Sequence, residues 1–445
     1  MKSAVSTAIL LSACAAAILL AQATPARALP LYARQTGQEC AACHNGFPEL
    51  TPYGRLFKLN GYTFGGGQSD LPPLSMMVIT SDTHTQAAQP GGAAPHYAPN
   101  NNISWDAASV FYGGAITSNI GAFGQVTYNA VDRSLSWDNT DIRYATSVHV
   151  FDKDAILGIS VNNNPSLSDV WNSTPAWGYP FVGSAVAPTP DVATMIEGAF
   201  AQQVVGATAY GFWGRLVYGE VGLYSTLTKG VDSALGVVPT GTTAIKGVAP
   251  YWRFAIEPSW GPNSLEFGTF GFAAALNPGR VTGFGTDHAV DIGFDTQYQY
   301  LAEHNSFSVQ ANYIIENQSL GASQAIGNTS NGRDRVQSSH IKASYYYDQT
   351  YGGTVGHFLV KGSADALGYG GFSADSSPNS SGWTTELDYM PFSHGGPEFW
   401  PWLNMKLGLQ YVWYDKFDGA AVNYDGAGRK AQDNNTLFAF AWFAF

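Results

Sequence analysis

Apolar and polar residues alternate through most of the chain, from about residue 75 to the C-terminus. A clear run lies at 306–315, where Phe307 and Tyr313 alternate with Gln310 and Asn312. This alternation is typical of β-strands with one buried face, and runs of about ten residues suit strands that cross a membrane. We count about sixteen such segments. They start near residues 75, 103, 121, 140, 155, 200, 216, 249, 263, 289, 305, 335, 352, 382, 403 and 435.

The connections between these runs alternate in length. Short turns are expected near 118–121, 152–154, 213–215, 261–263, 304–305 and 350–352. Long polar loops lie between them, for example at 86–102, 164–197, 229–246, 318–333, 364–381 and 418–434. The segment 392–403 is an exception, because it is long for a turn on the short side. Short turns at one end and long loops at the other are the arrangement of porins.

The longest loop, 164–197, contains two tryptophans and several prolines. It could fold inward as a constriction, cover the outer mouth, or remain a plain surface loop. The chain ends in aromatic residues that alternate with alanine as far as Phe445. Such an ending resembles the C-terminal assembly signal of outer-membrane barrels and implies a periplasmic C-terminus. An even number of strands then places the start of the first strand on the same side.

These patterns predict an all-β fold: an antiparallel outer-membrane β-barrel of about 16 strands, preceded by a small, partly helical N-terminal segment. A soluble β-sandwich fits the alternating connection lengths less well. A solenoid would require an internal repeat of about 20–50 residues, and we see none in the sequence.

The composition agrees with a barrel. Charged residues make up 12% of the chain and aromatic residues 14%, whereas soluble domains carry about 25% charged residues. The net charge of −12 argues against a basic surface for nucleic acid. We assign this acidity to solvated loops in preference to a surface that attracts cations such as Fe²⁺.

The N-terminus has the features of an export signal. Lys2 precedes an apolar stretch, 4–20, and small residues flank possible cleavage sites before residue 29. We therefore expect a signal peptide at 1–28 and a location in the outer membrane of a Gram-negative bacterium. Beyond this leader no run of about 18 apolar residues predicts a transmembrane helix.

The chemistry of the chain centres on Cys40, Cys43 and His44, which form a C-x-x-C-H motif. Two thiols one turn apart can each bond a haem vinyl group, and the histidine that follows is then the proximal axial ligand of the iron. The alternatives are a redox-active C-x-x-C pair and half of a zinc site. A redox-active pair would usually lie in a thioredoxin-like βαβ unit, and the sequence shows none. A zinc site would need two further Cys or His ligands at suitable spacing, and none lies nearby. The motif therefore predicts one covalently bound haem c.

The flanks of the motif are similar to those of a known family. Residues 28–37 (ALPLYARQTG), 47–51 (FPELT) and 57–63 (FKLNGYT) resemble the fused monohaem cytochrome–porins, whose best-known members are outer-membrane Fe(II) oxidases. The resemblance implies a haem-bearing plug at 29–74 and a porin-like barrel at 75–445. It further implies Fe²⁺ as the extracellular reductant and a periplasmic cytochrome or copper protein as the acceptor.

Within the N-terminal segment we expect a helix that begins after Thr51, with Pro52 in its first turn and Gly61 beyond its end. Its apolar residues could cover a haem edge. Three cations, Arg34, Arg55 and Lys58, could meet the propionates or lie in solvent. The sixth position of the iron is open. Candidates are Met76, Met77, His84, His149, His340, His357 and Met390.

The polar residues expected on inward strand faces could line a wet wall or bind the plug. They are Arg143, Glu220, Arg253, Glu257, Glu266, Asp291, Asp295, Lys342, Lys361, Glu386, Asp388 and Lys406. The preferred functional hypothesis is electron transfer from an extracellular donor through one haem to periplasmic carriers. With Fe²⁺ as the donor, the protein would be an Fe(II) oxidase. The alternatives are a porin whose haem segment is a redox sensor or gate, and a soluble periplasmic cytochrome.

Overall fold

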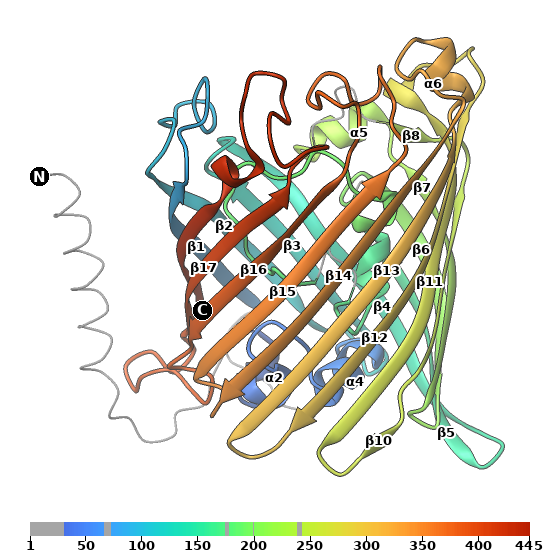
Figure 1. The fold of residues 1–445 in the computed structure, drawn as a ribbon. Helices are drawn as coiled ribbons and strands as arrows, with labels where there is room; N and C mark the ends of the chain where they lie inside the picture. The colour runs from blue at the N-terminus through green and yellow to red at the C-terminus, as the bar shows by residue number, and fades with distance from the viewer. Residues whose placement is uncertain (1–30, 66–72, 174–177, 199, 238–242) are drawn as a thin grey trace, which may run out of the picture.

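The computed structural model describes residues 31–65, 73–173, 178–198, 200–237 and 243–445. Sixteen long strands and two strands of two residues form one antiparallel sheet that closes on itself, because β1 pairs with β18 as well as with β2 (Figure 1). The long strands are β1 Leu74–Thr85, β2 Asn102–Ala115, β3 Ile120–Asn129, β4 Ser134–Val150, β5 Lys153–Asn162, β6 Val204–Trp213, β7 Val217–Thr226, β9 Ala249–Ile256, β11 Asn263–Asn277, β12 Asp287–Leu301, β13 Asn305–Ser319, β14 Arg333–Tyr347, β15 Tyr351–Gly362, β16 Ser380–Tyr389, β17 Asn404–Lys416 and β18 Thr436–Ala444. The short strands are β8 Ala244–Ile245 and β10 Ser259–Trp260.

The predicted barrel of about 16 strands is confirmed, as is the alternation of short and long connections. One connection at the long end, β3–β4, is shorter than the rest, because the 17-residue strand β4 begins close to the end of β3. Other loops carry the helices α5 Lys229–Ala234 and α6 Gly321–Ala325 and the 3₁₀ turns η4 Pro278–Arg280 and η5 Ala431–Asn434. The exceptional long turn, β16–β17, is present at the short-turn end.

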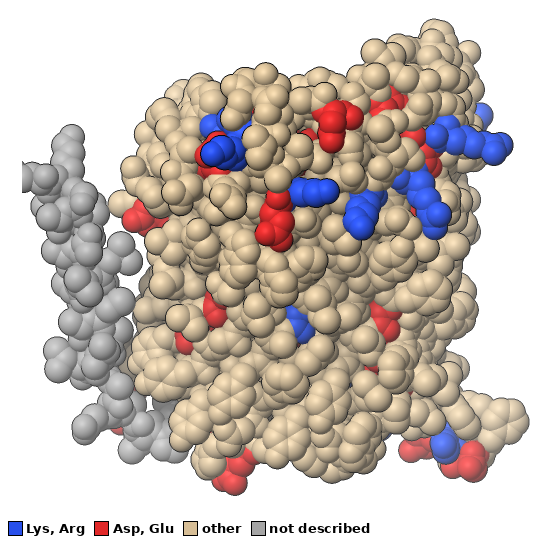
Figure 2. Space-filling model, in the orientation of Figure 1, with Lys and Arg blue, Asp and Glu red and all other residues tan. Residues whose placement is uncertain are grey.

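The two faces of the wall differ sharply. Along β12, Asp291 and Asp295 are buried inside the barrel, whereas Ile292 and Phe294 are exposed on its outer surface. Figure 2 shows the consequence: charged side chains gather towards the long-loop end and at turn tips, with few between them. None of the helices in the described part of the chain has the length and apolar character to cross a bilayer.

The N-terminal segment lies inside the barrel, towards the end with the short turns (Figure 1). It contains helices α2 Leu31–Thr36, α3 Cys40–Cys43 and α4 Pro52–Leu59. The predicted start of α4 is confirmed, since the Thr51 hydroxyl accepts a hydrogen bond from the Gly54 N–H at 3.2 Å. A Cβ atom at Gly54 would lie 2.3 Å from the Cys43 carbonyl oxygen, so only glycine lets α4 approach α3 this closely.

The β5–β6 loop also folds into the lumen, so of its three predicted placements the inward one is correct. It contains the 3₁₀ turns η1 Pro165–Ser168 and η3 Met195–Glu197. Trp171 is completely buried and packs on Leu59 of the N-terminal segment and on wall residues such as Tyr218. We call residues 163–203 the inward loop. The lumen thus holds two layers of chain. The expected signal peptide and most of the glycine linker lie outside the described residues.

Acidic residues account for most of the buried charge. Sixteen acidic and five basic side chains are buried among the described residues. Our assignment of the acidity to solvated loops is therefore wrong for a large share of it, because strand periodicity turns many of these residues into the lumen.

Candidate functional site

The C-x-x-C-H motif occupies a single helical turn. Cys40 and Cys43 begin and end α3, and their thiols are not joined to each other. His44 follows directly and donates its backbone N–H to the Cys40 carbonyl at 2.9 Å. Cys40 is buried and Cys43 is partly exposed. The two sulfur groups and the imidazole are therefore neighbours on one turn, as covalent haem attachment requires.

The His44 ring is oriented by its own loop. Its Nδ1 lies 2.9 Å from the Pro48 carbonyl oxygen. A carbonyl only accepts, so Nδ1 carries the proton and Nε2 keeps its lone pair in the neutral ring. Burial lowers the pKa of His44 to about 4, so the ring is neutral at ordinary pH. A ligating histidine whose other nitrogen donates to a carbonyl is the common arrangement at metal centres, and His44 fits the role of an axial ligand.

The surroundings of the thiols differ from those of a redox-active pair. Burial raises the pKa of Cys43 to about 11 and also raises that of Cys40. Reactive C-x-x-C thiols have lowered pKa values. The described residues include no group of three or more His, Cys, Asp or Glu side chains that could hold a metal ion, as a structural zinc site would need.

Two neighbouring segments clamp α3. On one side Thr51 donates from its hydroxyl to the Ala42 carbonyl at 2.7 Å. On the other side the β16–β17 turn covers the helix: the Ala41 N–H donates to the Ser393 carbonyl at 3.2 Å, and Ser393 is itself buried. His394 of the same turn lies 3.2 Å from the carboxylate of Glu39. The exceptional length of this turn therefore has a structural role, which is to close over the motif.

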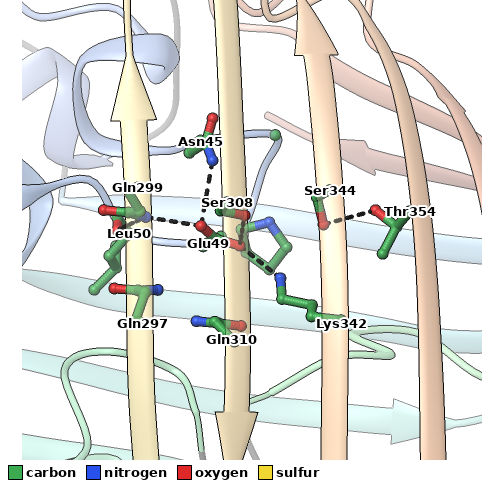
Figure 3. A network of polar contacts seen from close by, with 12 residues as sticks. Asn45, Glu49, Leu50, Gln297, Gln299, Ser308, Gln310, Lys342, Ser344 and Thr354 are labelled. Carbon is green, nitrogen blue, oxygen red and sulfur yellow. Dashed lines mark hydrogen bonds and ion pairs between the residues drawn. The ribbon is translucent and has the colours of Figure 1, made fainter. Parts of the chain in front are cut away.

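Glu49 anchors the motif to the barrel wall (Figure 3). Its completely buried carboxylate lies 2.5 Å from the Lys342 ammonium of β14. It also accepts hydrogen bonds from Gln299 at 2.7 Å, Ser308 at 3.1 Å and Asn45 at 3.2 Å. Burial alone raises the pKa of Glu49, but Lys342 and these hydrogen bonds outweigh burial and bring it below its ordinary value. The Glu49 carboxylate is thus charged, and both of its oxygen atoms have partners.

Arg55 forms a second anchor from α4. Its guanidinium lies 2.7 Å from Glu257 and donates to Gln297 at 3.0 Å and to Gln299 at 2.9 Å. This side chain is buried, so the expected alternative of contact with solvent is wrong. Contact between Arg55 and a haem propionate stays a prediction. Of the two expectations for the inward wall residues, binding of the plug is the correct one at Glu257 and Lys342.

The other two candidate cations are engaged with the protein as well. Lys58 donates to the Leu167 carbonyl of the inward loop at 2.6 Å, and burial lowers the pKa of this ammonium to about 8. Arg34 donates to the Leu74 carbonyl and lies over the ring of Trp402 at 5.9 Å.

The inward loop has an anchor of its own. Arg253 of β9 lies 3.4 Å from Asp169 of the loop and 2.5 Å from Asp295 of β12. The indole N–H of Trp171 donates to Glu257 at 2.6 Å. Because Glu257 also binds Arg55, one wall carboxylate holds both the N-terminal segment and the loop.

The candidates for the sixth iron position are scattered. His84 and His357, two of the candidate iron ligands, lie on the outer surface of the barrel. Lys361 lies there as well, so our placement of this residue on an inward face is wrong. Their strand neighbours point inward, which is a phase error of one residue. Met76 is exposed as well, and His149 lies in an exposed pair with Asp154 at the turn end.

Three candidates lie inside. His340 faces the lumen beside the inward loop. Met77 packs in a cluster with Phe47, whose ring contacts the His44 ring at a centroid distance of 4.9 Å. Met390 is buried at the start of the turn that covers α3.

The sequence did not single out Glu49 as an anchor, although Lys342 and Glu257 were expected on the inward face.

No protein-family model and no curated protein matches the chain. Solved outer-membrane channels are similar at low identity. DcaP of Acinetobacter baumannii is 10% identical with a TM-score of 0.45, over 85% of this chain and 99% of that chain. OmpF of Salmonella typhi, in complex with daunomycin, is 10% identical with a TM-score of 0.45, over 84% and 97%. An anion-selective porin from Comamonas acidovorans is 11% identical with a TM-score of 0.41, over 83% and 98%. Similarity at this level carries no argument about function.

Proposed function

We propose that the protein is an outer-membrane electron-transfer protein, in which Cys40, Cys43 and His44 hold one haem c and electrons pass from an extracellular donor to a periplasmic cytochrome or copper protein. The observation that carries the proposal is the C-x-x-C-H turn inside a closed barrel, with His44 Nδ1 bound to a carbonyl and Nε2 left to bind iron. A haem iron with a histidine ligand exchanges one electron at a time.

The barrel supports the location in the outer membrane. Its strands close without an edge, and their outward faces carry exposed apolar residues such as Ile292 and Phe294. Such a surface is stable in lipid and unstable in water. We assign the short-turn end, where the motif lies, to the periplasm, as is usual for barrels of this kind.

The residues of the chain then have three tasks. Glu49 and Arg55 fix the N-terminal segment to the wall, so that the motif is held towards the periplasmic end. The β16–β17 turn excludes water from one side of α3. The inward loop fills the lumen above the segment and separates the motif from the long-loop end. This arrangement holds the motif in place and restricts the passage of solutes.

Fe²⁺ is the proposed donor, on the strength of the resemblance at residues 28–63. The test mixes purified holoprotein with Fe²⁺ under anoxia and follows the haem absorption bands. We expect the bands of the reduced haem to appear. A haem that dithionite reduces but Fe²⁺ leaves oxidised at the working pH would overturn the choice of donor.

A porin with a redox-controlled gate is the second hypothesis, and the two layers of chain in the lumen weigh against it. Conductance in planar bilayers separates the hypotheses. We expect small currents that do not change when the protein is reduced. Large currents that switch with the redox state would support the gate instead.

A further inference from the structure

Four basic side chains lie together on the outer face of the barrel, near the long-loop ends of β14, β15 and β17. They are all exposed: Arg333 and Arg335 of β14, Lys361 of β15 and Lys416 of β17. Figure 2 shows basic side chains in a row across this part of the surface, below the long loops. We call these four residues the outer basic row.

The pairing of β14 with β15 makes three of the cations neighbours. The Ser363 N–H donates to the Arg335 carbonyl at 3.0 Å, so these two residues lie opposite each other. Lys361 is two residues from Ser363 on the same face, which makes it a diagonal neighbour of Arg335 at about 7–8 Å. Arg333 lies two residues beyond Arg335, again on the outer face. Three positive charges therefore share a small area of the wall.

Lys416 extends the row by two strands. It pairs with Ser381 of β16, and Ser381 pairs with Leu359 of β15, two residues from Lys361. Asp415, the acid next to Lys416 in the chain, is exposed as well. Within the described part of the chain, no ion pair joins any of the four cations to an acid. The outer basic row therefore has positive charge available for a partner.

The sign of this charge is opposite to that of the chain. The net charge is −12, and the buried side chains of the described residues include sixteen acids and five bases. Strand periodicity turns acids such as Asp291 and Asp295 into the lumen, whereas the outer basic row faces outward. Unpaired cations that gather on the outside of an acidic protein fit a negatively charged partner on that side.

The outer basic row lies at one edge of the apolar band. Tyr351 begins β15 at the short-turn end, and its ring stacks on Tyr389 at 5.3 Å. Lys361 is ten residues further along the same strand, about 33 Å along its axis and about 25 Å along the membrane normal at the usual tilt. This is the height of the apolar band of outer-membrane barrels. Between these levels the outward side chains are apolar, as at Ile341 and Leu387, so the cations lie where lipid headgroups begin.

We propose that the outer basic row binds the phosphate groups of a glycolipid in the outer leaflet, whose acyl chains lie along the apolar wall. An arginine can bind two phosphate oxygens at once, and a lysine binds phosphate as a point charge. The apolar surface beside the row favours a lipid over a phosphate free in solution. The inference goes beyond the proposed function, because it does not involve the haem, and it uses the assignment of the long-loop end to the cell exterior.

The test measures binding of diphosphoryl lipid A, a phosphorylated glycolipid, to the delipidated holoprotein in detergent micelles by native mass spectrometry. We expect the wild type to bind lipid A and Arg335→Gln together with Lys361→Gln to bind it at least ~10-fold more weakly. Both side chains are exposed, so the variant should keep heat-modifiable mobility. The matched control is Arg133→Gln together with Lys229→Gln, which removes the same charge from exposed positions outside the row.

Equal binding of lipid A by the wild type and the double variant would overturn the site, as would an equal loss in the control pair. Lipid A without its phosphates should bind weakly, and binding as tight as that of the diphosphoryl form would exclude recognition of phosphate. Inorganic phosphate should leave the bound lipid A in place. If inorganic phosphate displaces it, the row is a site for free phosphate and the glycolipid is the wrong partner.

Discussion

The N-terminal segment and the inward loop fill the same lumen but are held in it differently. The segment brings its own charges to the wall, with Glu49 on Lys342 and Arg55 on Glu257. The loop adds a longer ion pair with the wall, Asp169 with Arg253 at 3.4 Å, and hydrogen bonds to its backbone: Gln297 and Gln310 both donate to the Trp171 carbonyl, at 3.1 and 2.7 Å. A buried ion pair penalises any position in which a charge loses its partner, whereas backbone hydrogen bonds tolerate changes of side chain. We infer that the segment, whose ion pairs with the wall are shorter, is held more firmly than the loop.

The largest expected effect is at the motif. Cys40→Ala together with Cys43→Ala removes both thioether bonds, so we expect complete loss of covalently bound haem. Haem staining of a denaturing gel measures this. The barrel does not depend on the thiols and should still show heat-modifiable mobility. Covalent haem that persists in the double variant would contradict the assignment of the motif.

The next effect concerns the anchor of the segment. Glu49→Gln leaves the Lys342 ammonium buried without a counter-charge, which we expect to weaken docking by about 3–5 kcal/mol. Limited proteolysis of the N-terminal segment in the holoprotein should then be faster. Adding Lys342→Met to this variant removes the stranded charge and should restore much of the resistance. Lys361→Met is the control, because Lys361 is exposed on the outer face. If Glu49→Gln resists proteolysis as well as the wild type does, the ion pair does not fix the N-terminal segment, and the proposed difference between this segment and the inward loop is wrong.

A smaller effect is expected in the loop. Trp171→Phe keeps an aromatic ring in the same cluster but leaves Glu257 without the indole N–H, at a cost of about 1–3 kcal/mol. We expect a loosened loop and a higher conductance in planar bilayers, with the covalent haem retained. Conductance equal to that of the wild type would show that the loop does not restrict the lumen.

The smallest effect is a pH dependence where the loop meets the outer rim. Burial raises the pKa of the Asp418 carboxyl to about 7, and this group accepts the Asp191 N–H at 3.1 Å. The folded state therefore binds more protons than the unfolded chain between the ordinary carboxyl pKa of about 4 and pH 7, and stability falls as the pH rises through this window.

Asp418→Asn should flatten this dependence in thermal unfolding measured from pH 4 to pH 8. Asp415→Asn is the control, because Asp415 is exposed three residues earlier in the chain. The same slope in the wild type and in Asp418→Asn would exclude Asp418 as its source.

Strand periodicity was sufficient to predict the barrel, its strand number and the alternation of its connections, since each of these follows from local sequence. It was not sufficient for the faces of His84 and His357, because an error of one residue in the phase of the alternation reverses the face. The anchors could not be predicted either. Glu49 and Lys342 are 293 residues apart, and only closure of the barrel brings them together.

The turn that covers α3 constrains the order in which the protein matures. Ser393 and His394 are added late in synthesis, yet they close over a helix near the start of the chain, and Cys40 is only 3% exposed in the finished barrel. An enzyme that attaches haem could reach the Cys40 thiol only while the chain is still open. Under the proposed function, haem ligation therefore precedes insertion into the membrane, and the final pairing of β1 with β18 seals the cofactor inside.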